Sequence, residues 1–155
     1  MRSEHSTFNA EENLSSTQNV AFKKRAFQSS ILNGPSFAEN AVDDIFGDFW
    51  DCASTDFEDR PYWYVDLDSY YEIQQVEILN RADCCPERLH DVDVTVAGCN
   101  EDFHMLCGTF EGPGTASERV VLECPKGTIG RYVKLQITKG INNILSICEV
   151  KVIGK

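Results

Sequence analysis

Apolar and polar residues alternate with a period of two in several short segments of the chain. In such a segment every second side chain turns to the same side, which is the pattern of a strand with one buried face. Many of the apolar positions hold β-branched or aromatic residues, which fit a pleated, half-buried surface. The pattern predicts strands over residues 62–67, 73–80, 92–97, 131–137 and 148–153, and a further short strand over residues 119–124.

Turn residues separate these segments, and no stretch keeps a helical period over three turns. Combinations of Gly, Pro and Lys punctuate the chain at residues 34–35, 112–114, 125–127 and 139–140. Many short strands with frequent turns predict an all-β sandwich or jelly roll. No linker or repeat interrupts residues 19–155, so we place one domain there. The polar residues 1–18 are interpreted as a flexible N-terminal arm.

Composition narrows the range of partners. The chain has 155 residues, enough for a single hydrophobic core, and 42% of them are hydrophobic. With 14 basic and 25 acidic residues the net charge is −11, which would repel a phosphate backbone or an anionic membrane surface. No apolar run reaches the roughly 18 residues of a membrane span. We therefore predict neither a nucleic-acid partner nor membrane insertion.

The cysteines indicate the compartment. Seven cysteines, including the adjacent pair Cys84-Cys85, are more typical of an oxidising environment than of the cytosol. The first 18 residues lack the apolar core of a secretory signal, so we expect the sequence to represent a mature form or one made for expression. The triplet Asn13-Leu14-Ser15 matches a glycosylation acceptor. We expect a secreted, extracellular protein.

The segment from Asn40 to Arg60 is unusually acidic. Its carboxylates include Asp43, Asp44, Asp48, Asp51, Asp56, Glu58 and Asp59. A solvated acidic loop is the ordinary interpretation of such a run. A calcium site is the alternative, because Ca²⁺ takes six to eight oxygens from carboxylates and backbone carbonyls. The segment has no EF-hand spacing, so spacing alone gives calcium only modest support.

A second unusual segment reads Arg-Ala-Asp-Cys-Cys-Pro-Glu-Arg, from Arg81 to Arg88. Two guanidinium groups with a carboxylate between them can form a preorganised set of hydrogen-bond donors. A disulfide between Cys84 and Cys85 would close a tight ring with an exposed sulfur face. The residues alone also allow a surface ion-pair cluster and two free thiols, and they do not decide between these interpretations.

This segment resembles the F-type lectins, the fucolectin family. The family pattern is a His, 26 residues, Arg-x-Asp, four residues, and Arg or Lys, and its second half matches Arg81, Asp83 and Arg88. Further matches follow the family order at residues 19–22, 40–43, 62–67, 80–88, 129–133 and 147–152. The resemblance implies an eight-stranded β-sandwich jelly roll with a discoidin-like topology.

The resemblance also implies a binding site for terminal L-fucose-type sugars. Arg81 and Arg88 would hydrogen-bond the fucose hydroxyls and ring oxygen, and Asp83 would hold the arginines. The disulfide between Cys84 and Cys85 would pack against the apolar edge of the sugar. Fucosylated glycans or glycoproteins would then be the partners, and because one site per chain leaves multivalency to assembly, a homo-oligomer is a possible form.

One position departs from the family pattern. Counting back from Arg81, the family His falls on Ser54. A serine hydroxyl reaches less far than an imidazole, and losing one sugar hydrogen bond weakens binding by ~1 kcal/mol, about fivefold to tenfold. Phe49 and Trp50 are candidates to close the apolar side of the site, although core packing is favoured for at least one of them. The histidines are interpreted as solvated surface residues: His5, His90 and His104.

The resemblance further implies a structural Ca²⁺ between the acidic loop and the last strand. Its ligands would be the side chains of Asp43, Asp51 and Glu149 and backbone oxygens of Asn40, Ile45 and Cys148. Three disulfides are implied as well: Cys52–Cys148, Cys84–Cys85 and Cys107–Cys124, with Cys99 left over.

Two other classes of function compete with a lectin. No nucleophile elbow, metalloprotease helix or phosphate loop occurs in the chain. Glycan hydrolysis needs two carboxylates across a pocket, whereas this candidate site presents two arginines, so we expect no enzyme. The third class is an adhesion or interaction module that keeps the fold and calcium but has altered or lost fucose binding. Ser54 is the feature that favours it.

Overall fold

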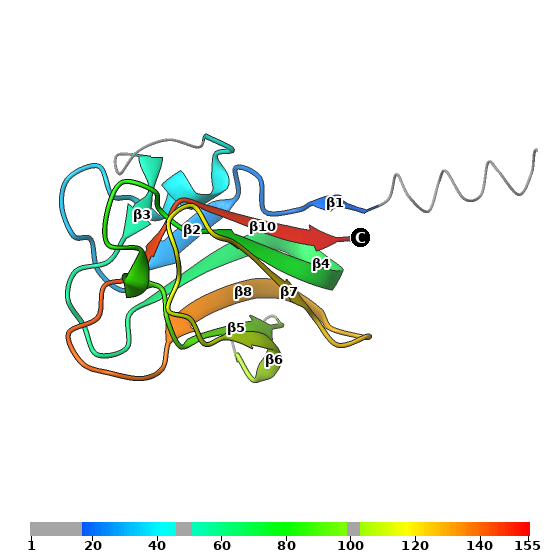
Figure 1. Cartoon of the computed structure of the whole chain (residues 1–155). Coiled ribbons are helices and arrows are strands. Elements are labelled where there is room, and N and C mark those ends of the chain that lie inside the picture. Colours follow the sequence, from blue (N-terminus) through cyan, green and yellow to red (C-terminus); the bar gives the residue numbers. More distant parts are fainter. Residues whose placement is uncertain (1–16, 46–50, 99–102) are drawn as a thin grey trace, which may run out of the picture.

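Two antiparallel β-sheets face each other in the computed structural model of the chain (Figure 1), which describes residues 17–45, 51–98 and 103–155. The prediction of an all-β sandwich is confirmed. Two short 3-10 helices, η1 (Ala38–Val42) and η3 (Pro86–Arg88), lie in loops. The strands are β1 (Gln18–Asn19), β2 (Arg25–Gln28), β3 (Ala53–Ser54), β4 (Tyr62–Leu79), β5 (Val92–Ala97), β6 (Met105–Phe110), β7 (Arg119–Glu123), β8 (Ile129–Ile137), β9 (Ser146–Ile147) and β10 (Glu149–Gly154).

Strand β4 belongs to both sheets. Its first half pairs with β2 and β8, and its second half pairs with β10 and β7. The first sheet contains β10, β7 and the second half of β4, and β1 extends it along β10. The second sheet contains β2, β8 and the first half of β4, and β5 and β6 extend it along β8. Between the halves the pairing with β8 shifts register after Asp66, and Asp68 has a φ of 68°. This bend carries the chain from one layer of the sandwich to the other.

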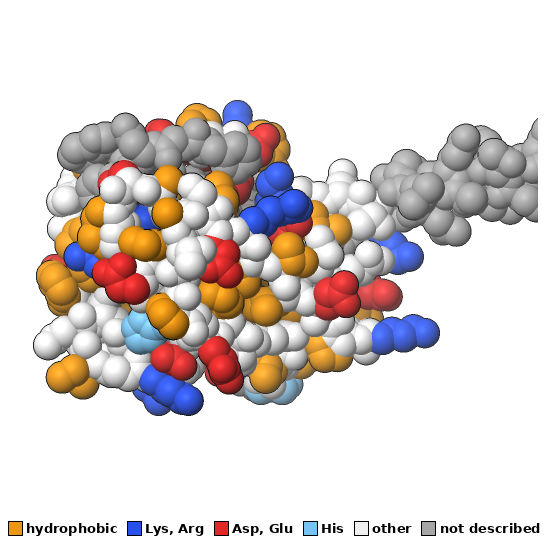
Figure 2. Space-filling view, in the orientation of Figure 1, with side chains coloured by type: hydrophobic (Ala, Val, Ile, Leu, Met, Phe, Trp, Pro, Cys, Tyr) orange, Lys and Arg blue, Asp and Glu red, His pale blue; other side chains and the backbone are white. Residues whose placement is uncertain are grey.

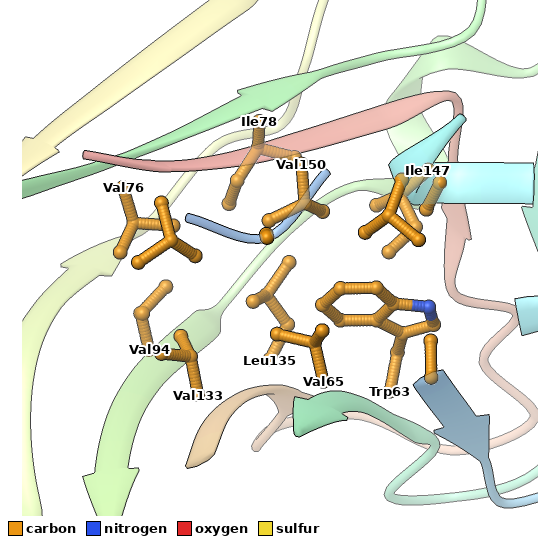
Figure 3. Packing of buried hydrophobic residues seen from close by; sticks show 14 of the residues in the cluster. Trp63, Val65, Val76, Ile78, Val94, Val133, Leu135, Ile147 and Val150 are labelled. Atoms are coloured by element: carbon orange, nitrogen blue, oxygen red, sulfur yellow. The ribbon is translucent and has the colours of Figure 1, made fainter. Parts of the chain in front are cut away.

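The core fills the space between the two sheets (Figure 3). Trp63 and Val65 enter it from the first half of β4, while Val76 and Ile78 enter it from the second half. All four side chains are 1% exposed or less. The Trp63 Nε1–H donates to the carbonyl oxygen of Ala38 at 2.9 Å, so the buried indole keeps a hydrogen bond. Within each pair the residue between them, Tyr64 or Glu77, therefore faces away from the core.

Most predicted strands coincide with observed ones. The segment 92–97 is β5, and the predictions over 119–124, 131–137 and 148–153 lie within two residues of β7, β8 and β10. The segments 62–67 and 73–80, predicted as two strands, belong to the single strand β4, and the bend at Asp68 lies between them. The unpredicted β6 has a half-exposed Leu106 and a glycine at position 108, so its sequence lacks a clear alternation.

Three disulfides are formed: Cys52–Cys148, Cys84–Cys85 and Cys107–Cys124. They are the pairs that the family resemblance implied. Cys52 and Cys148 are 96 residues apart in sequence, and their bond ties the segment before β3 to the segment before β10. Cys99 lies outside the described residues.

The predicted arm, residues 1–18, lies almost entirely outside the described residues, but Gln18 already pairs with Gly154 in the first sheet. No helix in residues 17–45, 51–98 and 103–155 is long and apolar enough to cross a membrane. On the face drawn in Figure 2, acidic and basic side chains are interspersed with hydrophobic ones. The negative net charge therefore does not gather into a single patch on this face.

Candidate functional site

The segment from Asn80 to Leu89 forms a loop after β4, and the loop between β6 and β7 holds it in place. The Asn80 side-chain amide donates to the carbonyl oxygens of Pro86 and Thr115, at 3.0 Å each. The Gly114 N–H donates to the Leu89 carbonyl oxygen at 2.8 Å. A Cβ at Gly114 would lie 2.7 Å from the Asn80 amide nitrogen. The close crossing of the two loops therefore requires glycine at position 114.

Arg81 is buried at the base of this loop, with 4% of its surface exposed. Its Nε and Nη2 donate to the two carboxylate oxygens of Asp83, at 3.0 and 2.9 Å. The hydrogen bond from Arg81 is the main cause that lowers the pKa of Asp83 below the ordinary aspartate value. Asp83 therefore remains ionised at mildly acidic pH and fixes the plane of the guanidinium.

The Cys84–Cys85 disulfide follows directly on the surface side. Cys84 is exposed and Cys85 is half-buried, with a φ of 57° that turns the chain into η3. Arg88, at the end of η3, is half-buried, and its N–H donates to the Cys85 carbonyl oxygen at 3.1 Å. Its guanidinium forms no hydrogen bond or ion pair with any residue that the structure describes. The loop thus combines a fixed guanidinium, an accessible sulfur surface and a second guanidinium with available donors.

Ser54 points into the protein rather than toward this loop. Its side chain is fully buried in β3, and its Oγ lies 2.9 Å from the Oγ of Ser146 in β9. The short Ser54 side chain is enclosed and already hydrogen-bonded, so this structure gives no support to the prediction that its hydroxyl contacts a sugar. Phe49 and Trp50, the other candidates for sugar contact, lie outside the described residues.

Glu149 is a buried carboxylate at the start of β10, only 1% exposed. Burial raises the pKa of Glu149 to about 8, and the charges of Asp43 and Asp44 add to the increase. The Asp44 N–H donates to both carboxylate oxygens of Glu149, at 3.3 and 3.2 Å, and this hydrogen bonding opposes the increase in pKa. A hollow of about 210 Å³ opens here on the outer side of the first sheet, lined by Glu77, Ile78, Leu79, Arg119, Glu149 and Lys151.

The other candidate cation ligands lie in the loop around η1 or next to the disulfide. Asp43 is half-buried, and its Oδ1 accepts the Ile45 N–H at 3.0 Å. The Ile45 side chain is 54% exposed. The Asn40 amide donates to the Cys52 carbonyl oxygen at 3.3 Å. Asp51 is half-buried, and Cys148 belongs to the disulfide. Among the described residues, no three His, Cys, Asp or Glu side chains are grouped to hold a metal.

His90 was expected as a solvated surface residue, and this expectation is wrong. It is half-buried, with Nδ1 at 2.8 Å from an oxygen of Asp91 and Nε2 at 3.0 Å from Oδ1 of Asn143. The Asn143 amide donates in turn to the carbonyl oxygens of Asp59 and Lys139. His90 therefore links the end of the 80–89 loop to the loop before β9. The partner lies 53 residues away, so no local sequence signal indicated it. His104 is exposed, and His5 lies outside the described residues.

A family model described as "NedA-like, galactose-binding domain" matches residues 40–135 of the chain. Fucolectin-6 of Anguilla japonica is 36% identical over 142 residues, which cover 87% of this chain and 75% of that protein.

Two solved structures share the fold. A serum F-lectin (fucolectin) of the striped bass, Morone saxatilis, superposes with a TM-score of 0.81 and 30% identity. The match covers 89% of this chain and 49% of that one, so this chain spans about half the length of the striped bass protein. The lectin domain of lectinolysin, solved with Lewis B antigen, gives a TM-score of 0.78 and 30% identity, covering 87% of this chain and 95% of that one.

Proposed function

Since the chain belongs to the F-type lectin family of fucolectins, we propose that it is a secreted lectin that binds terminal L-fucose-type glycans through Arg81 and Arg88. Its relatives are lectins and carbohydrate-binding domains, not enzymes, and we assign it no catalysis. Fucosylated glycans are the partners that this family membership supports.

The observation that carries the proposal is the buried Arg81 held at two points by Asp83, beside an exposed disulfide. A neutral sugar has no charge to attract a cation, so the guanidinium acts as a directional donor to adjacent hydroxyls. Asp83 removes the rotational freedom that Arg81 would otherwise lose on binding, which improves affinity. The sulfur atoms of Cys84 and Cys85 offer an apolar surface next to these donors, and the available donors of Arg88 complete the set.

Titration calorimetry of the full chain with methyl α-L-fucoside tests the proposal. We expect a saturable heat of binding at millimolar or lower concentration, and much weaker binding of methyl β-D-glucoside, whose hydroxyls have a different arrangement. At about 10 mM fucoside, only binding free energies weaker than ~3 kcal/mol escape detection. A correctly folded protein that shows no binding under these conditions would contradict the proposed fucose site.

Secretion and multivalency belong to the same proposal. Three disulfides suit an oxidising compartment, and the striped bass relative is a serum protein. With one proposed site per chain, cross-linking of glycans on two surfaces requires assembly into a homo-oligomer.

A second candidate function is an interaction module on the same fold with altered or lost fucose binding. The buried position of Ser54 favours it, because the residue that replaces the family His offers no donor to a sugar. Where fucose binding is lost, no heat is released with the fucoside, and the same calorimetry decides between the two candidates.

Replacing Ser54 with alanine separates a structural role from a binding role. We expect Ser54→Ala to lower the free energy of unfolding by about 1–2 kcal/mol, because the Ser146 hydroxyl loses its partner in the interior. The fucoside dissociation constant should stay unchanged. Urea unfolding and calorimetry measure the two effects, with the exposed Ser69→Ala as a control. Weaker binding at unchanged stability would return Ser54 to the sugar site.

We also propose a structural Ca²⁺ held by Glu149 and Asp43, with Asp51 and the backbone oxygens of Asn40, Ile45 and Cys148 as further ligands. The chemistry of the donors supports a hard cation, since a buried carboxylate beside two other negative charges is unfavourable when ionised. A bound divalent cation would offset this cost and join the acidic loop to the start of β10.

Calcium removal tests this site. A ligand present at 100 times its dissociation constant stabilises a protein by about 2.7 kcal/mol, so a chelator should lower the melting temperature and added Ca²⁺ should restore it. The variant Glu149→Gln should lose this response, while melting without Ca²⁺ at or above the temperature of the parent, because it removes the cost of burying a carboxyl that is ionised in the unfolded chain. Equal transitions of the parent chain in Ca²⁺ and in chelator would rule the site out.

A further inference from the structure

The outer surface of the second sheet carries aromatic side chains on neighbouring strands. Cross-strand register places Phe27 of β2, Tyr64 of β4 and Lys134 of β8 in one row. Their sequence neighbours Trp63 and Val133 are buried in the core, so alternation turns this row outward. We name the following set the aromatic face: Phe27, Tyr62, Tyr64, Phe103, Tyr132 and Lys134.

The rings of the aromatic face support one another. The centroids of Phe27 and Tyr64 are 4.9 Å apart, with nearly parallel rings, and Phe103 lies 5.7 Å from Tyr64 and 6.4 Å from Tyr132. These separations are typical of favourable aromatic pairs. Phe27 remains 41% exposed, whereas Tyr132 is 8% exposed. The accessible part of the face is therefore the Phe27 side of a fixed cluster of rings.

Lys134 lies among these rings. Its Nζ is 4.7 Å from the Phe103 ring centroid and 6.0 Å from that of Tyr62. Burial alone lowers its pKa. It forms no ion pair with any carboxylate in the described parts of the chain, although Asp93 lies on the neighbouring strand β5, two residues from Thr95, which faces Lys134. An anionic group of a ligand would supply the missing partner and form a charge-assisted hydrogen bond.

Next to the aromatic face, basic side chains outnumber the carboxylates that pair with them. Asp66, in the adjacent row, accepts hydrogen bonds from Arg131 at 2.8 and 3.0 Å and from Arg25 at 3.2 Å. Asp68 adds a second carboxylate, 3.8 Å from Arg25 and 3.9 Å from Lys24. Three cations thus share two carboxylates here.

We propose that the aromatic face is a second ligand site, which binds a pyranose carrying a carboxylate or sulfate group. The apolar face of the sugar ring would lie against Phe27 and Tyr64, and its anionic group would pair with Lys134. An apolar platform with one placed charge is the composition of a small-ligand site. This site is separate from Arg81, because it lies on a sheet surface, whereas Arg81 lies in a loop beyond the end of β4.

The charges favour a single acidic sugar over a polyanion. Lys134 forms no ion pair within residues 17–45, 51–98 and 103–155, and its neighbours Arg25 and Arg131 are already held by Asp66. A nucleic acid or a highly sulfated chain would meet the negative remainder of the surface. A sugar with one anionic group matches this surface, because the surface offers one ammonium, that of Lys134, beside the exposed ring of Phe27.

Chemical-shift mapping of the ¹⁵N-labelled chain with methyl β-D-glucuronide tests the proposal, with the sulfate ester methyl 6-O-sulfo-β-D-glucoside as a second probe. We expect saturable shifts in β2, β4 and β8 with at least one of these probes, and at least ~5-fold weaker binding of the uncharged methyl β-D-glucoside. These shifts in β2, β4 and β8 should be the same when methyl α-L-fucoside is present at saturation. The site is overturned if both anionic probes, at about 20 mM, cause no shifts in these strands, or cause shifts only in residues 80–89.

Two variants identify the contacts. Lys134→Gln should weaken binding of the anionic probe about fivefold or more, and the same change at the exposed Lys126 should have no effect. Phe27→Ser should weaken the anionic and neutral sugars alike, since it removes the apolar platform. The melting temperature of each variant shows that it is folded. Unchanged binding in Lys134→Gln would refute the role of the ammonium, and with it the proposal.

Discussion

Replacing both Cys52 and Cys148 with alanine is expected to lower the free energy of unfolding by about 4–5 kcal/mol. The bond closes a loop of 96 residues, and in the chain-entropy model a loop of about 100 residues contributes ~4.7 kcal/mol by constraining the unfolded chain. For a chain of this size each kcal/mol corresponds to about 2–4 °C, so the melting temperature should fall by on the order of 10 °C or more. Urea unfolding of the double variant measures the effect without leaving a free thiol.

The Cys107–Cys124 bond is the matched control. It closes a loop of 17 residues, for which the same model gives about 3 kcal/mol. The double alanine variant at these positions should therefore be less destabilised than the first. The opposite order would show that loop closure is not the main contribution, and that packing around the sulfur atoms decides the stability.

Arg81→Ala is expected to have the largest effect on sugar binding. Hydrogen bonds to a charged donor contribute about 1.5–3 kcal/mol each, so losing two of them weakens fucoside binding by at least ~100-fold. The variant also leaves Asp83 without the guanidinium that fixes it, so part of the loop's order is lost. Calorimetry with methyl α-L-fucoside measures the affinity, and thermal unfolding measures the cost to the fold.

Arg131→Ala separates these two effects. Arg131 makes the same two-point contact with Asp66, through Nε and Nη2, but on the outer surface of the second sheet. Its loss should affect stability while leaving fucoside affinity unchanged. If both variants bound fucoside as tightly as the parent chain, the donors of the sugar site would have to be sought elsewhere.

Period-two alternation predicted the strands whose inner residues are all apolar. In β5, Val92, Val94 and Val96 are fully buried and the residues between them are not core residues, so its bounds follow from the sequence. The bend of β4 could not be predicted, because its pairing partners lie up to about 80 residues away and the local pattern shows only two separate runs.

The site was predictable where it depended on family spacing and unpredictable where it depended on tertiary contacts. The pairing of Arg81 with Asp83 spans two residues and matched the family pattern. The burial of Ser54 depends on Ser146, and the position of His90 depends on Asn143, each far along the chain. Neither contact leaves a trace in the local sequence.

The pairing of β10 has a practical consequence for how the protein can be attached. Glu149 pairs with Leu79, two residues before Arg81, whereas Gly154 pairs with both Ile73 and Gln18 at the opposite end of the sheet (Figure 1). A biotin or a flexible tether joined after Lys155 would therefore hold the molecule by the end away from the 80–89 loop. A biosensor surface prepared in this way would present every captured molecule in one orientation, with its arginine loop directed into the flow.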